Sequence, residues 1–201
     1  GIRQVVLGAA GLDTRSSRLS WPEGSVLYEL DHVQVLSRKE DVLRAAGASP
    51  RRRRASVGGD LTADWETPLA EAGFDRESPS AWLVEGLLFY LPSALGADLL
   101  DRAARMAAPG SWLGFDIVNE AVLTSPITRP WIEMQAAAGA PWIGAMDDPD
   151  AFLAARGWTA ELTAAGQPEA NHGRWSFPVI PIRMPGMPHN WFVVARKGPA
   201  G

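Results

Sequence analysis

The sequence predicts an α/β fold built on a mostly parallel sheet with helices on both faces. Up to about residue 118, short apolar runs of strand length alternate with longer stretches of helical character. About four or five strand–helix units of this kind imply parallel strands, and a parallel sheet is covered on both faces. A chain of 201 residues, 46% hydrophobic and 21% charged, has the size and composition of one globular domain with a substantial core.

The expected elements follow one another in a regular order. Strands are expected at 3–8, 25–30, 55–59, 80–86 and 111–117. Helices are expected at 32–46, 64–72 and 93–108. Asp64 is a plausible N-cap of the second helix, and Pro109-Gly110 ends the third. The Arg51–Arg54 run leads into the third strand, and we interpret it as solvated.

The pattern changes after residue 120. A helix is expected at 120–139, broken near Pro126 and Pro130, followed by a short helix at 148–156 and a strand at 159–163. Residues 166–188 are rich in Pro, Gly and Arg and are expected to form a loop before a last strand at 190–196. We therefore expect a single domain over residues 1–201, with residues 120–188 as an insertion on the substrate side.

Composition excludes several classes of protein. A net charge of −4 and a pI near 5.4 do not suit a nucleic-acid binder. No apolar run reaches the roughly 18–20 residues of a membrane helix, and no signal peptide opens the sequence, which predicts a cytoplasmic protein. Cysteines are absent and the three histidines are widely spaced, so no metal site is expected.

Small or acidic residues end each of the first four predicted strands. They are the Gly8–Asp13 turn, Asp31, Asp60-Leu61 and Glu85-Gly86. Ligands of open parallel sheets bind beyond the carboxyl ends of the strands, and a carboxylate accepts hydrogen bonds from paired hydroxyls. Asp31 follows Gly11 by 20 residues, about the spacing at which a carboxylate reaches a ribose. Together they predict a site for a nucleoside with a free ribose.

Simpler roles remain open for the single residues. Asp31, Glu29 or Asp60 would serve equally well as a helix cap, and Arg15 would pair with Asp13 or Glu29. A nicotinamide dinucleotide is the rival ligand. The Gly8–Asp13 turn disfavours it, because Asp13 occupies the third glycine position of the dinucleotide fingerprint and would oppose a pyrophosphate.

Four segments carry a family resemblance. VVLGAAGLDTRSSRLSWP, LYELDHVQVLSRKEDVL, GGDLTADWETPLAEAGFD and SAWLVEGLLFYLP resemble, in order and spacing, the leucine carboxyl methyltransferase-like family of class I S-adenosylmethionine-dependent methyltransferases. The most similar branch is the actinobacterial one, which includes carboxyl and O-methyltransferases of aromatic polyketide pathways in secondary metabolism. The terminal NWFVVARKG resembles the last strand of the family, which is antiparallel.

The resemblance implies a Rossmann-like fold and S-adenosyl-L-methionine as cofactor. It assigns cofactor binding to Ala9, Gly11, Asp31, Asp60, Leu61 and Glu85. Ala9 stands where the family often has glycine, and we expect slightly tighter packing there without loss of binding. The family also has N-terminal lid helices with an arginine that holds the cofactor carboxylate, and this sequence does not contain them.

The resemblance further implies methyl transfer to an oxygen of a small molecule. A carboxylate is ionised at pH 7 and needs no general base, so the lack of an evident base favours a carboxyl acceptor. A hydroxyl acceptor would favour a base, for which Tyr90 and His172 are weak candidates. Trp131, Trp142 and Trp175 would line an aromatic pocket. A protein-tail acceptor, an inactive cofactor-binding homologue and an NAD-dependent oxidoreductase are the alternatives.

Overall fold

The computed structural model describes residues 1–182 and 184–199, and its contacts divide the chain into two compact units. The first unit contains Gly1–Val84, Arg102–Leu113 and the C-terminal residues from Lys197. The second contains Glu85–Asp101 and Gly114–Arg196.

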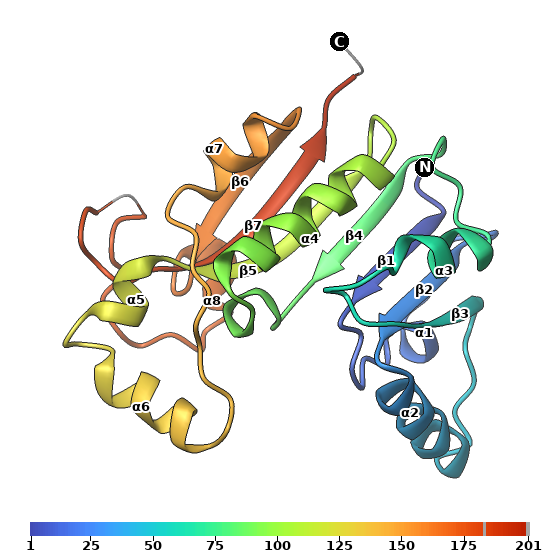
Figure 1. The fold of residues 1–201 in the computed structure, drawn as a ribbon, viewed down its shortest axis with the longest axis horizontal. Coiled ribbons are helices and arrows are strands. Elements are labelled where there is room, and N and C mark those ends of the chain that lie inside the picture. The colour runs from blue at the N-terminus through green and yellow to red at the C-terminus, as the bar shows by residue number, and fades with distance from the viewer. Residues whose placement is uncertain (183, 200–201) are drawn as a thin grey trace. The chain divides into compact units, whose positions relative to one another are not determined.

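Four parallel strands form the sheet of the first unit, in the order β3-β2-β1-β4 (Figure 1). They are β1 (Gln4–Gly8), β2 (Val26–Asp31), β3 (Arg53–Gly58) and β4 (Ser80–Val84). Gly8 lies opposite Leu30 on one side and Val84 on the other. The carboxyl ends of these strands therefore meet at one edge of the sheet.

Both faces of this sheet are covered. On one face, Val5, Leu7 and Leu27 form a buried cluster against Trp21. Buried Glu29 lies on the same face, where it pairs with Lys39 of α2 (Val33–Ala45). The other face carries Tyr28 and Trp82, which make edge contacts with aromatic rings from the α3 region (Glu66–Glu71). The pleat of the strands thus separates two packed layers, as expected for a parallel sheet.

Three further strands, whose residues belong mainly to the second unit, lie in the order β5-β7-β6. They are β5 (Trp112–Val118), β6 (Trp158–Ala164) and β7 (Asn190–Lys197). Asn119 donates its backbone N–H to His189 at 3.1 Å, and Lys197 exchanges backbone hydrogen bonds with Gly110 and Ser111. Pairing that runs from Asn119–His189 to Ser111–Lys197 makes β7 antiparallel to β5, as Figure 1 shows.

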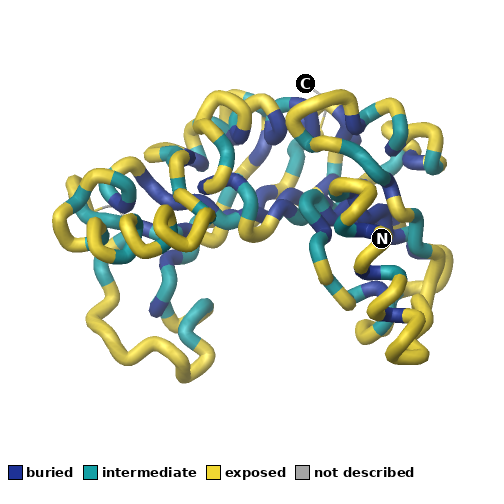
Figure 2. The backbone as a smooth tube through the Cα atoms, turned by 60° about the horizontal axis from the view of Figure 1, so that its bottom comes forward, coloured by how far each residue is buried: buried dark blue, intermediate teal, exposed yellow. Residues whose placement is uncertain are grey.

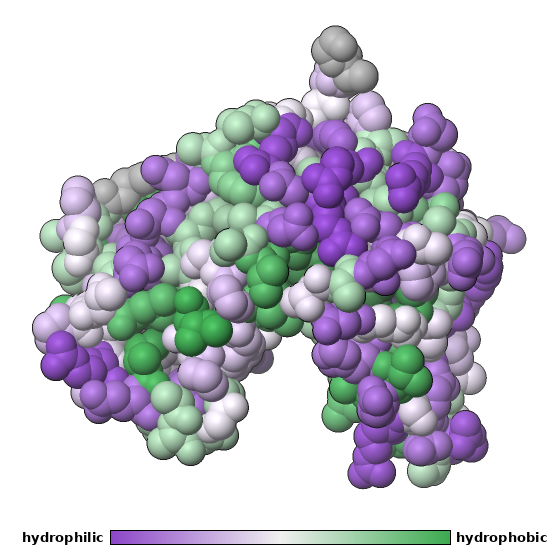
Figure 3. All heavy atoms as spheres, viewed as in Figure 1, coloured by the Kyte–Doolittle hydropathy of each residue, from purple (hydrophilic) through white to green (hydrophobic). Residues whose placement is uncertain are grey.

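Helices and loops connect the strands. Besides α2 and α3, the helices are α1 (Arg15–Arg18), the 3₁₀ turn η1 (Leu88–Tyr90), α4 (Ser93–Met106), α5 (Glu120–Thr124), α6 (Arg129–Ala137), α7 (Pro149–Ala154) and α8 (Pro168–Asn171). Figure 2 shows buried positions concentrated along the strands and exposed positions along the outer faces of the helices. In Figure 3, hydrophobic residues gather over α5 and α6, where Ile127 and Met134 are exposed.

The predicted α/β class, with a mostly parallel sheet and an antiparallel last strand, is confirmed. The expected helix at 120–139 is present as α5 and α6, with a break that contains Pro126, whereas Pro130 lies in the first turn of α6. The segment expected to be a loop at 166–188 also contains a short helix, α8, which was not predicted. The sequence predicts a loop at Pro168, but this residue lies in the first turn of α8, where a proline is tolerated. Within residues 1–182 and 184–199, no helix is both long and apolar enough to cross a membrane.

The structure identifies the partner of Arg15 among the expected ones and corrects the interpretation of the Arg51–Arg54 run. Glu29 pairs with Lys39 at 2.8 Å and lies 3.5 Å from Arg54, whereas Arg15 pairs with Asp13. The Arg51–Arg54 run is not uniformly solvated, because the Arg54 side chain is buried against Glu29 and also pairs with Glu40. A buried carboxylate requires such partners.

Candidate active site

The turn after β1 has a backbone conformation of the kind that lets a ligand approach the main chain closely. Ala9 has a φ of 52° and Gly11 a φ of 47°, both in the left-handed region. Ala10 donates its N–H to the Leu30 carbonyl at 3.0 Å, and Asp13 donates to the Ala10 carbonyl at 2.9 Å. The turn is therefore fixed by backbone bonds, with Ala9 in a conformation that costs a non-glycine residue free energy.

Asp31 connects this turn to the end of β2. Its two carboxylate oxygens accept the backbone N–H groups of Gly11 and His32, each at 2.7 Å. The N-cap of α2 is His32, and it has no side-chain capping bond. Each carboxylate oxygen has a second acceptor position, so two adjacent ribose hydroxyls fit this half-buried side chain.

Asp60 and Leu61 lie at the end of β3, next to Asp31. Gly59 donates its N–H to the Asp31 carbonyl at 2.9 Å, and the Leu61 side chain approaches the Gly8 position. Asp60 is exposed and accepts the Thr62 hydroxyl at 2.7 Å and the Thr62 N–H at 2.8 Å. These hydrogen bonds lower the pKa of Asp60, so it stays ionised well below neutral pH.

The structure thus brings together five of the predicted cofactor residues within the first unit. The five are Ala9, Gly11, Asp31, Asp60 and Leu61. Asp13 accepts the Arg15 N–H at 2.6 Å and pairs with its guanidinium at 3.2 Å, so a carboxylate stands in the turn where a pyrophosphate would need N–H donors. The arrangement fits a nucleoside without phosphates.

Glu85, the sixth predicted residue, belongs to the second unit and is exposed. Gly86 beside it has a φ of 66° and donates its N–H to Asp116 of β5 at 2.7 Å. Burial raises the pKa of Asp116, the Gly86 N–H lowers it, and nearby Glu85 raises it. Asp116 therefore fixes the turn that carries Glu85. The sequence analysis missed it, although an acid within an apolar strand was a usable signal.

Tyr90, the weak catalytic candidate, lies in η1 and is 37% exposed. Its ring contacts Phe89 at 4.8 Å and Trp142 at 6.2 Å between centroids. Trp142 stacks on Phe89 at 3.9 Å and Trp131 meets Trp142 edge-on at 4.2 Å. Trp131 and Trp142, two of the three tryptophans expected to line a pocket, are therefore members of an aromatic cluster, and Tyr90 lies at its edge.

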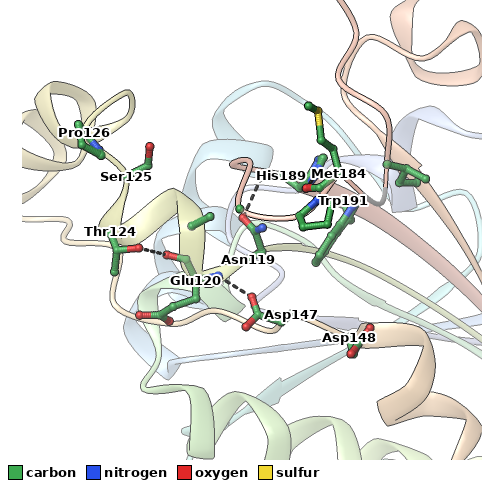
Figure 4. A pocket seen from close by; sticks show the side chains of 14 residues that line it. Asn119, Glu120, Thr124, Ser125, Pro126, Asp147, Asp148, Met184, His189 and Trp191 are labelled. Carbon is green, nitrogen blue, oxygen red and sulfur yellow. Dashed lines mark hydrogen bonds between the residues drawn. The ribbon is translucent and has the colours of Figure 1, made fainter.

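A cavity of about 740 Å³ lies within the second unit (Figure 4). It is lined by Asn119, Glu120, Ala121, Thr124, Ser125, Pro126, Asp147, Asp148, Ile182, Met184, Pro185, Gly186, His189 and Trp191. Trp175 lines a smaller cavity of about 200 Å³ in the same unit. The sequence analysis did not identify His189, which is 5% exposed, whereas His172, its other base candidate, is exposed at the end of α8.

Solved structures with the same fold include methyltransferases. An O-methyltransferase family protein from Burkholderia thailandensis has a TM-score of 0.65 at 12% identity, over 99% of this chain and 52% of that one. Human N-acetylserotonin methyltransferase in complex with S-adenosylmethionine has a TM-score of 0.58 at 12% identity, over 98% of this chain and 48% of that one. The fold is that of the Rossmann-like methyltransferases.

Sequence comparison defines the family. The model of leucine carboxyl methyltransferase matches residues 1–104. A Streptomyces coelicolor protein named as an S-adenosyl-L-methionine-dependent methyltransferase is 39% identical over 206 residues, covering 100% of this chain and 67% of that protein. A Mycobacterium avium protein named likewise is 36% identical, covering 98% of this chain and 68% of that protein. The chain therefore belongs to the leucine carboxyl methyltransferase family of S-adenosyl-L-methionine-dependent methyltransferases.

Proposed function

We propose that this methyltransferase transfers its methyl group to a carboxylate oxygen of a small aromatic acid of the polyketide type. The observation that carries the carboxylate part of the proposal is the match of residues 1–104 to the leucine carboxyl methyltransferase model. S-adenosyl-L-methionine supplies a methyl group activated by a sulfonium, so the protein mainly has to align the acceptor oxygen with it and exclude water.

The first unit supplies the proposed cofactor contacts. Asp31 accepts the two ribose hydroxyls, and the turn from Ala9 to Gly11 lets the backbone approach the nucleoside. Asp60 and Leu61 lie beside the adenine. Glu85 of the second unit binds near the methionine end, in the turn that Asp116 fixes through Gly86. These roles follow from the resemblance and agree with the contacts of Asp31 and Gly11.

The cavity of the second unit supports a small acceptor. Its volume of about 740 Å³ is typical of small-molecule sites. A carboxylate acceptor is ionised at neutral pH, so the proposed role of the protein is to place it and not to deprotonate it.

The test is a transfer assay with methyl-labelled S-adenosyl-L-methionine and a panel of aromatic carboxylic acids. A methyl ester releases labelled methanol in mild alkali, whereas a methyl ether retains its label. We expect alkali-labile product. Alkali-stable product would overturn the carboxyl assignment in favour of a hydroxyl acceptor. Binding of S-adenosylhomocysteine with no product from any acid would favour an inactive homologue.

A further inference from the structure

His189 occupies a rigid position in the wall of the second unit's cavity. Its backbone N–H donates to the Asn119 side-chain oxygen at 2.8 Å, and its carbonyl accepts the Asn119 N–H at 3.1 Å. The Asn119 side-chain amide donates in turn to the Met187 carbonyl at 2.9 Å. The imidazole stacks nearly parallel on Trp191, with 5.5 Å between centroids. Figure 4 shows Asn119, His189 and Trp191 on one side of the cavity.

The contacts of the imidazole define which nitrogen is available. Nε2 lies 3.3 Å from the Met184 carbonyl oxygen. A carbonyl only accepts, so Nε2 carries the proton in this contact, and Nδ1 of the neutral ring is an acceptor. Across residues 1–182 and 184–199, Nδ1 has no hydrogen-bond partner. A histidine that is 95% buried and lines both this cavity and the smaller cavity of about 200 Å³ therefore presents an unused acceptor.

Charge on the same cavity limits what binds beside His189. Glu120 and Asp147 are exposed lining residues, and Asp147 is held in place by the Glu120 N–H at 2.9 Å. Asp148 also lines the cavity, so three carboxylates oppose any further one nearby, and the carboxylate of an acid is better placed at the end of the molecule remote from them. A neutral hydroxyl meets no such opposition.

We propose that this cavity selects acids that carry a hydroxyl remote from the carboxylate, and that His189 Nδ1 accepts the hydrogen bond from that hydroxyl. His189 is then a specificity-determining residue that positions the acceptor and takes no proton from it. The inference rests on the proposed function for the identity of the methylated group, but the recognition of the hydroxyl is a binding property that is measured without turnover.

The test measures binding of three fluorescent probes in the presence of saturating S-adenosylhomocysteine. The probes are 6-hydroxy-2-naphthoic acid, 6-methoxy-2-naphthoic acid and 2-naphthoic acid. A neutral hydrogen bond in a buried site changes affinity about two- to tenfold. We therefore expect the wild-type protein to bind the hydroxy acid about fivefold more tightly than the other two. Equal affinity for all three would overturn the proposal without any variant, even if methyl esters are formed.

Substitutions assign the preference to His189. His189→Gln retains a donor that reaches the Met184 carbonyl but has no acceptor at the Nδ1 position, so the preference should vanish. His189→Asn places an amide oxygen near that position and should restore part of it. His172→Gln, at an exposed position, is the matched control and should leave the preference intact. A preference that survives in His189→Gln would contradict the assignment.

Kinetics separate positioning from base catalysis. For any probe that is methylated, His189→Gln should raise KM for the hydroxy acid and leave kcat within a few-fold. A fall in kcat of about 10²–10⁴ at unchanged KM is the signature of a general base and would overturn the positioning role. If none of the three acids is methylated but the preference for the hydroxy acid persists, the proposed function is rejected and the proposed hydroxyl-binding role of His189 stands.

Discussion

The strand-end loops of the first unit and the cavity of the second unit differ in how their polar groups are satisfied. In the loops, both oxygens of Asp31 accept backbone N–H groups, and Asp60 is held by Thr62. In the cavity wall, His189 Nδ1 and the buried indole N–H of Trp191 lack partners among the described residues. The first arrangement is organised before a ligand binds, and the second has hydrogen-bonding capacity left for a ligand.

The two regions should therefore respond differently to substitution. Changes in the first unit should affect stability or cofactor affinity, because its polar groups also hold the chain together. Changes at the cavity should affect the choice of acceptor, because its orphan groups contribute little to folding.

The largest expected effect is on the stability of the first unit. Lys39→Met leaves buried Glu29 with only the more distant Arg54 as a cation, and a broken buried ion pair costs about 3–5 kcal/mol. Because Arg54 remains, we expect the free energy of unfolding to fall by about 3 kcal/mol in urea denaturation. Arg44→Met breaks the exposed pair with Asp41 and should cost less than about 1 kcal/mol. Equal losses in the two variants would contradict a buried ionic anchor.

The next effect is on cofactor affinity. Asp31→Ala removes the acceptor of two ribose hydroxyls, and hydrogen bonds to a charged group contribute about 1.5–3 kcal/mol each. We expect calorimetry with S-adenosylhomocysteine to show a Kd raised at least about tenfold. Asp60→Ala should raise it less, and Asp41→Ala, on the exposed face of α2, should leave it unchanged. A folded Asp31→Ala protein with wild-type Kd would remove Asp31 from the site.

A smaller effect is expected from Asp116 as the pH changes. Burial raises its folded pKa above the ordinary value of 3.8, so its contribution to stability is present below that value and is lost as the pH rises through the folded pKa. Asp116→Asn keeps an acceptor for the Gly86 N–H and does not titrate. The stability of Asp116→Asn relative to wild type should therefore increase from about pH 4 upward in urea titrations. A difference that stays constant or decreases with pH would contradict the raised pKa.

The smallest effect concerns Ala9. Its φ of 52° favours glycine, and relief of this strain is partly offset by the greater freedom of glycine in the unfolded chain. Ala9→Gly should therefore stabilise the protein by about 1 kcal/mol or less, with cofactor affinity within a few-fold of wild type. Thermal unfolding checks the sign. Destabilisation would show that the alanine methyl group packs favourably in the turn.

The two regions also differ in how well sequence predicts them. The strand-end residues were predictable because each lies directly after an apolar run, and Gly11 and Asp31 are only 20 positions apart. The cavity residues were not predictable from the sequence. Their arrangement depends on pairing between Asn119 and His189, which are 70 positions apart and lie at the ends of strands that run in opposite directions. Partners of buried charges were also missed. Glu29 pairs with Lys39 because α2 covers its face of the sheet, and no local sequence pattern predicts this pair.

The central claim is that the loops after β1, β2 and β3 form a nucleoside site for S-adenosyl-L-methionine and not a dinucleotide site. Parallel calorimetric titrations of the chain with S-adenosylhomocysteine and NAD test it most directly. We expect saturable heat with S-adenosylhomocysteine and none with NAD, because Asp13 stands where a pyrophosphate would bind. Saturable binding of NAD with no response to S-adenosylhomocysteine would contradict it.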